Sequence, residues 1–168
     1  MIEAEATRLA RIVDQILLAG QLDADAVELE VSECDPSEIA ARVIESAQAH
    51  SPETISLSLD VDGTPKISCD ENKLRQVLVN LVDNAVKYSP GGGRVELRVR
   101  NGDGSCVIDV VDEGLGIPPV ERERIFEKFY RLDPQQTHGV GGSGLGLYIV
   151  RELVERMDGR LSVESELG

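Results

Sequence analysis

The sequence predicts an α+β domain with a short helix before it. Apolar and polar residues alternate strictly over 55–61, which predicts a half-buried strand, while 94–101 and 105–112 predict a hairpin. Apolar residues in 71–89 instead recur at spacings of three and four, as in an amphipathic helix. Because a chain of 168 residues is long enough for one domain with its own core, we expect these strands and helices to share that core.

The charge balance argues against two classes of binding protein. The chain has 17 Lys and Arg against 31 Asp and Glu, a net charge of −14. Nucleic acids and anionic membranes are bound by positive surfaces, so neither is expected as a partner. A phosphate ligand would have to be held locally, by backbone amides, a metal and a few cations. The longest apolar stretches are a few residues long, so we expect no signal peptide or membrane segment in this chain and a cytoplasmic location.

The cysteines predict neither a zinc site nor a disulfide framework. Cys34, Cys69 and Cys106 are far apart in the sequence, and none belongs to a Cys-x-x-Cys pair. An odd, scattered set is typical of reduced cysteines that act as small hydrophobic residues in the cytosol.

The first helix is expected over 2–20, and it allows two interpretations. Its apolar residues follow the spacing of a short coiled-coil seam, with Ile2, Ala6, Leu9, Val13 and Ile16 on one side. This helix either packs on its own domain or is a piece of a helical bundle. A polar connector follows over 21–33, in which the alternation of Val27–Val31 suggests a strand.

The next elements are set by their capping residues. Asp35 and Pro36 start a helix that runs to about His50, since an acid at the N-cap and proline at the first position are both favourable. A short strand over 66–69 then leads to Asp70, a plausible cap for the helix 71–89.

The helix 71–89 carries an unusual polar stripe. At about 100° per residue, Asn80, Asn84 and Lys87 fall within roughly 60° of one another beside the apolar face, and Tyr88 lies at the border. Amide oxygens can ligate a hard cation such as Mg²⁺, a lysine can meet phosphate, and a tyrosine ring can cover an apolar heterocycle. The alternative is an ordinary solvated helix face.

An acid and two glycines end the second hairpin strand. Asp112 shares a face with Ile108 and Val110, and a carboxylate at the end of an aliphatic row is costly unless it meets a donor. Gly114 and Gly116 permit close backbone approach. The acid could accept a hydrogen bond from the exocyclic amine of adenine. Alternatively, the stretch is only a turn after a strand.

A second glycine cluster, 139–147, directly precedes a helix expected over 145–157. Exposed amides at a helix N-terminus form an anion site. Gly139, Gly141 and Gly144 also match the dinucleotide fingerprint G-x-G-x-x-G, but that motif needs a strand just before it, and no P-loop motif occurs.

The remaining segments are less regular. A short helical run is expected over 120–126, and 128–142 has no apolar periodicity. A connection that long is usually functional or disordered. A last strand is expected over 160–164.

These motifs resemble, in order, the boxes of the catalytic and ATP-binding domain of sensor histidine kinases (HATPase_c). Residues 80–88 resemble the N box, 112–117 the G1 box, 125–131 the F box and 142–147 the G2 box, and 157–165 resembles the segment after G2. Four boxes in the right order form a specific signal. The resemblance implies a Bergerat fold, which is a two-layer α/β sandwich whose mixed sheet is covered by helices on one face, with ATP between the helices and a mobile lid.

The resemblance also implies a role for each site residue. Asn84 would ligate Mg²⁺ with support from Asn80, and Lys87 would reach phosphate. Asp112 would accept from the adenine amino group, and Tyr88 and Ile117 would line the ring. The catalytic residues would be Asn80, Lys87 and Arg131, with Arg131 reaching the γ-phosphate. The nucleotide would further contact Gly114, Gly116, Gly142, Ser143, Gly144, Leu145, Gly146 and Leu147, with the amides of 144–146 facing the phosphates.

The family's acceptor histidine is missing from this sequence. That histidine precedes an acid and, further on, a proline, whereas His50 stands in His-Ser-Pro and His138 lies in the irregular segment. We therefore expect a fragment, in which 1–20 is the end of the second dimerization helix, 21–33 a connector, and 34–168 a catalytic domain lacking its final strand. Its partners would be ATP, the parent kinase's dimerization and histidine-phosphotransfer domain and, indirectly, a response regulator. The parent kinase itself could be membrane-anchored.

Two other functions are compatible with parts of the pattern. Hydrolytic relatives of the gyrase, chaperone and mismatch-repair type carry a glutamate one turn before the metal-ligating asparagine. Asn80 occupies that position here, and an amide cannot act as a general base. A nucleotide-binding module without transfer chemistry is the second alternative, although the boxes are intact.

Overall fold

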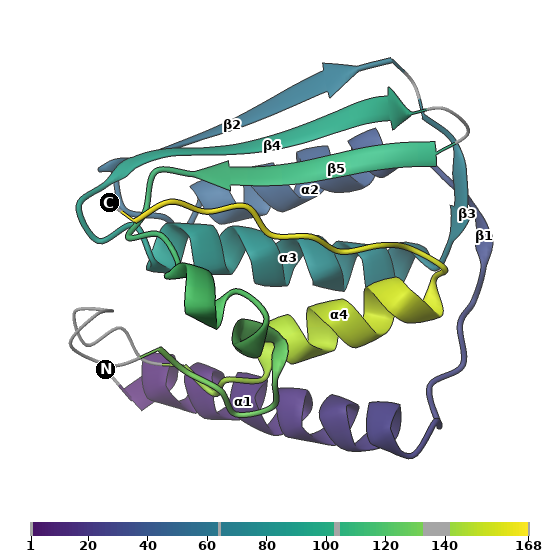
Figure 1. Cartoon of the computed structure of the whole chain (residues 1–168), viewed down its shortest axis with the longest axis horizontal. Helices are drawn as coiled ribbons and strands as arrows, with labels where there is room; N and C mark the ends of the chain where they lie inside the picture. Colours follow the sequence, from purple (N-terminus) through teal and green to yellow (C-terminus); the bar gives the residue numbers. More distant parts are fainter. Residues whose placement is uncertain (1, 64, 103–104, 133–141, 168) are drawn as a thin grey trace.

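The computed structural model describes residues 2–63, 65–102, 105–132 and 142–167. A mixed sheet forms one layer, with strand order β2 (Ile55–Asp62), β4 (Gly93–Gly102) and β5 (Ser105–Asp112). Strand β2 runs parallel to β4, and β5 runs antiparallel to it. The helices lie on one side of this sheet (Figure 1). The two-layer α/β sandwich expected from the resemblance is confirmed.

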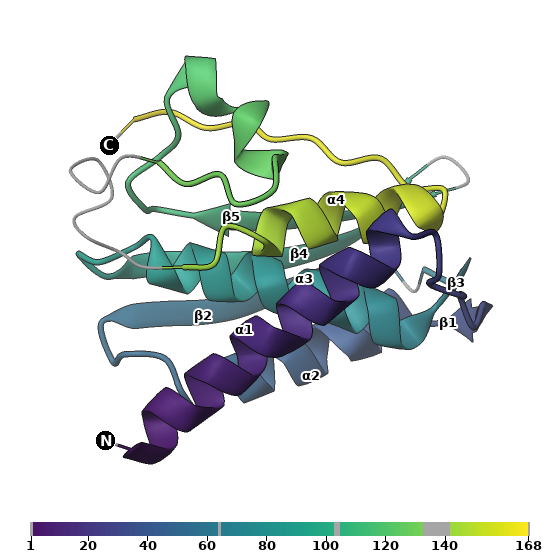
Figure 2. The same ribbon diagram turned by 90° about the horizontal axis from the view of Figure 1, so that it is seen from below.

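The helical layer consists of α2 (Pro36–Gln48), α3 (Glu71–Lys87) and α4 (Gly146–Arg156), with α1 (Ile2–Asp23) outside it. Figures 1 and 2 show α2 and α3 beneath the sheet, α4 beside α3, and α1 farthest from the sheet. Asp35 and Asp70 cap α2 and α3 as expected, because their carboxylates accept the N–H groups of Ser37 and Lys73 at 2.8 Å and 3.0 Å. Helix α1 continues past its expected end at Gly20.

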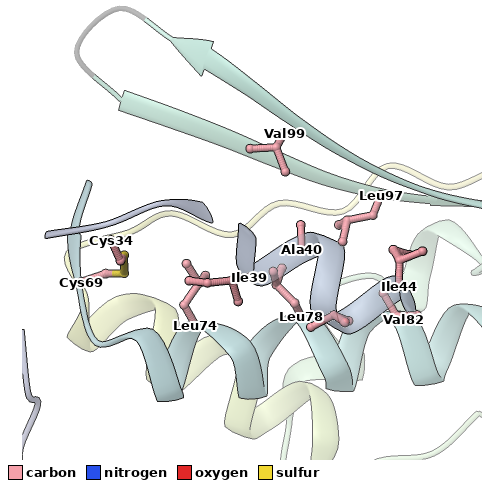
Figure 3. Close-up of a cluster of buried hydrophobic side chains, with 11 residues drawn as sticks. Cys34, Ile39, Ala40, Ile44, Cys69, Leu74, Leu78, Val82, Leu97 and Val99 are labelled. Carbon is pink, nitrogen blue, oxygen red and sulfur yellow. A yellow bond between two sulfur atoms is a disulfide. The ribbon is translucent and has the colours of Figure 1, made fainter. Parts of the chain in front are cut away.

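The main core lies between the sheet and α2 and α3. Strand β4 contributes Val95, Leu97 and Val99, each with no exposed surface, because alternate residues of a strand point to the same face. Figure 3 shows the aliphatic side chains of the two helices that meet this row, which are Ile39, Ala40, Ile44, Leu74, Leu78 and Val82. Aliphatic side chains therefore fill this core.

A second, small sheet corrects two expectations. Strands β1 (Ser32–Cys34) and β3 (Ile67–Cys69) pair antiparallel, and a disulfide joins Cys34 to Cys69 (Figure 3). The expectation of three reduced cysteines is therefore wrong for these two, and Cys106 alone is free. The strand suggested over Val27–Val31 is also misplaced, since the three residues of β3 pair only with 32–34.

The apolar contacts of helix α1 with its own domain come from its C-terminal half, among the side chains that the structure describes. Its side chains Leu18, Ala19 and Leu22 share a core cluster with Tyr148, Ile149, Val150 and Leu153 of α4. In contrast, Leu9, Val13, Ile16 and Leu17 are between 51% and 61% exposed. The interpretation that the helix packs on its own domain is therefore confirmed for residues 18–22, and the helical bundle stays a prediction for the exposed apolar residues before them.

Polar contacts fix the end of α1 against α4. The carboxylate of Asp23 accepts from the Tyr148 hydroxyl at 2.7 Å and from the Lys128 ammonium. The bond from Lys128, followed by the bond from Tyr148, lowers the pKa of Asp23. Arg156 binds Asp25 and the carbonyl oxygen of Leu22 at 2.6 Å and 2.7 Å.

Two expected elements differ in the structure. The helical run at 120–126 is two 3₁₀ turns, η1 (Pro119–Glu121) and η2 (Arg124–Phe126). The strand expected over 160–164 is not formed, although the chain there is extended and follows β5 (Figure 1). The next residue, Ser165, is hydrogen-bonded to the loop after β5. A hollow lies between β5 and the segment 160–164.

Candidate functional site

The polar stripe of α3 lies beside the buried face of that helix. Asn80, Asn84 and Lys87 are partly buried, and Tyr88 is the residue that ends α3. The buried side chains of the same helix are Leu74, Val77, Leu78, Val82 and Ala85. Asn80 donates its amide N–H to the carbonyl oxygen of Gln76 at 3.1 Å, which fixes the orientation of its amide.

The glycines of the G2 loop (residues 142–147) face this stripe. A Cβ added at Gly146 would lie 3.4 Å from Oδ1 of Asn80 and 3.9 Å from Nδ2 of Asn84. A Cβ added at Gly142 would lie 2.6 Å from Nζ of Lys87, so a larger residue there would displace the ammonium. The structure thus brings the predicted amides and lysine against the start of α4.

The start of α4 offers backbone amides with few local acceptors. Leu145, the N-cap residue, makes no side-chain capping bond, and its own N–H donates to the Ser143 hydroxyl at 3.2 Å. The first N–H groups of a helix have no partner within the helix, so they form an anion site. The Leu145 side chain is buried in the cluster shared with α1, and only its backbone is available for a ligand. The Ser143 hydroxyl donates to Gln15 of α1 at 2.7 Å.

Gly144 lets the F box (residues 125–131) approach the G2 loop. Its φ is +73°, and an added Cβ would lie 2.6 Å from the backbone carbon of Phe129. Any side chain at this position would push the two loops apart, since the contact is to backbone.

The G1 loop (residues 112–117) is bonded to the end of α3. The N–H of Leu115 donates to the carbonyl oxygen of Tyr88 at 3.0 Å. Asp112 lies opposite the buried Val95 on β4, two residues beyond Val110, and its side chain is exposed. One oxygen of this carboxylate accepts the N–H of Gly114 at 2.9 Å. A Cβ at Gly114 would lie 2.5 Å from the Tyr88 oxygen, so only glycine allows this approach.

A hollow of 1580 Å³ lies between the end of α3, the G1 loop and part of the F box. The predicted site residues that line it are Asn84, Tyr88, Asp112, Gly114, Gly116, Ile117, Arg131 and Leu147. Asn80, Lys87 and residues 142–146 are not part of its lining, and they lie where α3 faces the start of α4. The hollow also extends along β5 and the extended segment 158–167.

Aromatic and cationic groups lie together at the end of α3. The Lys87 ammonium lies 4.9 Å from the centre of the Tyr88 ring. Burial raises the pKa of the Tyr88 hydroxyl, and the charge of Arg131 opposes that shift. The tyrosine therefore stays neutral at physiological pH and presents an uncharged ring to the hollow.

The amide oxygens of Asn80 and Asn84 fit a magnesium ion whose other ligands are mainly phosphate and water oxygens. Mg²⁺ prefers oxygen ligands and usually keeps waters and substrate phosphates in its shell, so one or two amide oxygens are a sufficient protein contribution. Within the described residues, no group of three His, Cys, Asp or Glu side chains could hold a metal by itself. Asn84 and Asn80 carry amide oxygens of this kind beside the start of α4.

Some predicted features lie outside the described residues, and some site residues were not predicted. Residues 133–141, which include His138, Gly139 and Gly141, are not described. Leu115 and Ser165 line the hollow and were not predicted. Ser165 had one signal in the sequence, because it continues the alternation of Leu161 and Val163.

Comparison with known proteins identifies relatives of both the sequence and the fold. Residues 69–168 match the family described as histidine kinase-, DNA gyrase B- and HSP90-like ATPase. The circadian input-output histidine kinase CikA of Synechococcus elongatus is 35% identical over 165 residues, which are 95% of this chain and 22% of CikA. The chain therefore spans less than a quarter of the length of that relative.

Two solved structures share the fold. Full-length ShkA in complex with AMPPNP is 36% identical, with a TM-score of 0.84 over 95% of this chain and 33% of that chain. The histidine kinase ThkA in complex with the response regulator protein TrrA is 25% identical, with a TM-score of 0.71 over 94% of this chain and 43% of that chain. None of the helices in the described part of the chain is long and apolar enough to cross a membrane.

Proposed function

Because the chain belongs to the histidine kinase-, DNA gyrase B- and HSP90-like ATPase family, we propose that it is the catalytic part of a sensor histidine kinase. It binds Mg-ATP and donates the γ-phosphoryl group to a histidine on a dimerization domain. One observation carries this proposal. The carboxylate of Asp112 and the amide of Asn84 line the same hollow, and the glycine-rich start of α4 faces the polar stripe that contains Asn84.

Adenine binds at the G1 end of the hollow. Asp112 accepts from the exocyclic amine with the carboxylate oxygen that does not accept from Gly114. Gly114 and Gly116 keep the loop backbone free of side chains, and Ile117 and Tyr88 supply the apolar walls. An acceptor at this position favours adenine over guanine, whose corresponding position carries a carbonyl oxygen.

The phosphates bind at the start of α4. The amides of 144–146 meet phosphate oxygens together with the helix dipole, and Gly142 leaves room for the Lys87 ammonium. Asn84, supported by Asn80, would hold Mg²⁺ through amide oxygen, and the ion would supply positive charge beside the phosphates. Arg131, which lines the hollow, reaches the γ-phosphate. Catalysis then consists of positioning and charge stabilisation, which is what phosphoryl transfer requires from a protein.

Asn80 favours transfer to histidine over hydrolysis. Its amide nitrogen donates to Gln76, and an amide has no basic group with which to activate water. The acceptor must come from another segment, and the exposed apolar face of α1 suits that segment. Leu9, Val13 and Ile16 recur at helical spacing and form a seam for a helical bundle. In this proposal α1 is the end of the dimerization helix, 34–168 is the catalytic domain, and a cytoplasmic response regulator receives the phosphoryl group from the histidine.

Base selectivity tests the adenine assignment. We expect wild-type protein to bind Mg-ATP more tightly than Mg-GTP, and Asp112→Asn to lose about 10- to 100-fold in ATP affinity, since an unpaired polar group costs about 1–3 kcal/mol. In wild-type protein Oδ1 of Asp112 accepts the Gly114 N–H. An asparagine that keeps this bond would direct its NH₂ group toward the adenine amine, so two donors would face each other. Calorimetric titration measures both affinities.

Asp60→Asn is the matched control, because Asp60 is exposed on β2 and is not part of the lining of the hollow. It should leave ATP affinity within about twofold of wild type, because the substitution removes the same charge away from the site. Equal binding of ATP and GTP by wild-type protein would show that Asp112 does not read adenine.

A further inference from the structure

The extended segment after α4 ends in a half-buried serine. Along this segment Leu161, Val163 and Ser165 are half-buried, and Ser162, Glu164 and Glu166 are exposed. Ser165 therefore occupies the inward row of an alternating pattern, where the two preceding members are aliphatic. A hydroxyl in that row needs a hydrogen-bond partner, since an unpaired polar group in a half-buried position is unfavourable.

Ser165 joins three parts of the chain. Its Oγ accepts the N–H of Ile117 at 2.9 Å, a bond between residues that are 48 positions apart. Its carbonyl oxygen accepts from the guanidinium of Arg122, which directly follows η1. Ser165 also lines the hollow together with Ile117 and Asp112.

The adjacent backbone fits closely against the G1 loop. Gly116 has φ of +72°, and an added Cβ would lie 1.9 Å from the carbonyl oxygen of Glu166. Two hydrogen bonds from backbone N–H groups also hold the G1 loop. The Leu115 N–H donates to the end of α3, and the Ile117 N–H donates to Ser165.

We propose that Ser165 is a positioning residue for the adenine end of the nucleotide site. This inference rests on the proposed function. The Ser165 hydroxyl holds the Ile117 backbone, and therefore the Ile117 side chain, in its place in the lining of the hollow that also includes Asp112. Through its carbonyl and Arg122, the same residue also fixes the start of the segment that leads to Arg131. Without the hydroxyl, the Ile117 N–H loses its acceptor and the adenine wall is no longer preorganised.

Substitutions of equal shape separate the hydroxyl from the volume of the side chain. Ser165→Thr retains a hydroxyl and Ser165→Val replaces it with a methyl group, and both β-branched residues suit an extended backbone. We expect the valine variant to bind Mg-ATP about 5- to 20-fold more weakly than the threonine variant, as the loss of one hydrogen bond implies. Ser56→Ala, at an exposed site on β2 that is not part of the lining of the hollow, should bind like wild type.

Two further readouts distinguish positioning from a general structural role. The affinity for Mg-tripolyphosphate, which has no base, should be the same in the threonine and valine variants. Hydrogen exchange of the Ile117 amide should be slow in wild-type protein without nucleotide and faster in the valine variant.

Each contrary outcome has a distinct meaning. Equal ATP affinity of the threonine and valine variants, or fast exchange of the Ile117 amide in wild type, would overturn the role of Ser165. Parallel loss of tripolyphosphate and ATP binding in the valine variant would also overturn it, because the effect would then not be confined to the adenine end. Failure of wild-type protein to bind ATP at all would instead overturn the proposed function, and the exchange measurement on wild type would still test the Ser165 bond.

Discussion

Asn84→Ala should lower the affinity for Mg-ATP by at least about 10- to 100-fold, which is the loss typical when even an outer-shell partner of a metal ligand is removed. Asn84 lines the hollow and lies next to Gly146 at the start of α4. In the proposed site its amide oxygen is the main protein ligand of the metal. Removal of that oxygen should therefore abolish the part of the affinity that depends on Mg²⁺ and leave the metal-free part unchanged.

Calorimetric titration of ATP with excess Mg²⁺ and with a chelator separates the two contributions. Asn72→Ala is the matched control, because Asn72 is exposed in the first turn of the same helix. The control should bind like wild type in both conditions. An Asn84→Ala isotherm identical to that of wild type in excess Mg²⁺ would remove this asparagine from the metal site.

Loss of the disulfide should cost about 4 kcal/mol of unfolding free energy, because the closed loop spans 35 residues and cross-linking removes that loop's entropy from the unfolded chain. Cys34 and Cys69 are both buried, and each directly precedes the capping aspartate of a helix. Reduction therefore loosens the starts of α2 and α3 together. Urea unfolding of Cys34→Ala, and of wild type with reductant, measures the loss.

Cys106→Ser is the matched control, because Cys106 is the free cysteine. This variant should keep most of the unfolding free energy of the wild-type protein. Reductant should lower the stability of the variant as much as that of wild type. A thiol count in denaturant without reductant should find one thiol per chain. Three thiols, or equal urea midpoints with and without reductant, would contradict the disulfide and its contribution.

Elements encoded by neighbouring residues could be predicted from the sequence. The bounds of helix α3 were predicted within a few residues, because Asp70 caps it and its apolar residues recur at helical spacing. The bounds of β4 and β5 were also predicted within a few residues, because the two strands follow each other directly in the sequence. Features that depend on contacts between residues far apart in the sequence could not be predicted. Cys34 and Cys69 have no sequence signal for pairing, and the segment 160–164 alternates like a strand although its end is bonded to the G1 loop.

In the candidate site too, features set by neighbouring residues could be predicted, and features set by distant residues could not. The stripe of Asn80, Asn84 and Lys87 follows from helical periodicity, and the structure retains it. The reason for the glycines is visible only in three dimensions, because Gly142 lies against Lys87 of α3 and Gly144 lies against Phe129 of the F box. The contact between Ser143 and Gln15 of α1 could not be predicted either, since it links residues that are 128 positions apart.

Phosphoryl transfer to a second polypeptide tests the central claim most directly. The chain is incubated with ATP radiolabelled at the γ-phosphate, with and without a separate polypeptide that carries the family's histidine box. We expect this chain to stay unlabelled and the partner to acquire acid-labile label, which is absent when the partner's histidine is replaced by alanine. Asn84→Ala should abolish that label. Acid-labile label on this chain alone, lost in His50→Ala or His138→Ala, would contradict the account, as would a partner that stays unlabelled while the chain binds Mg-ATP.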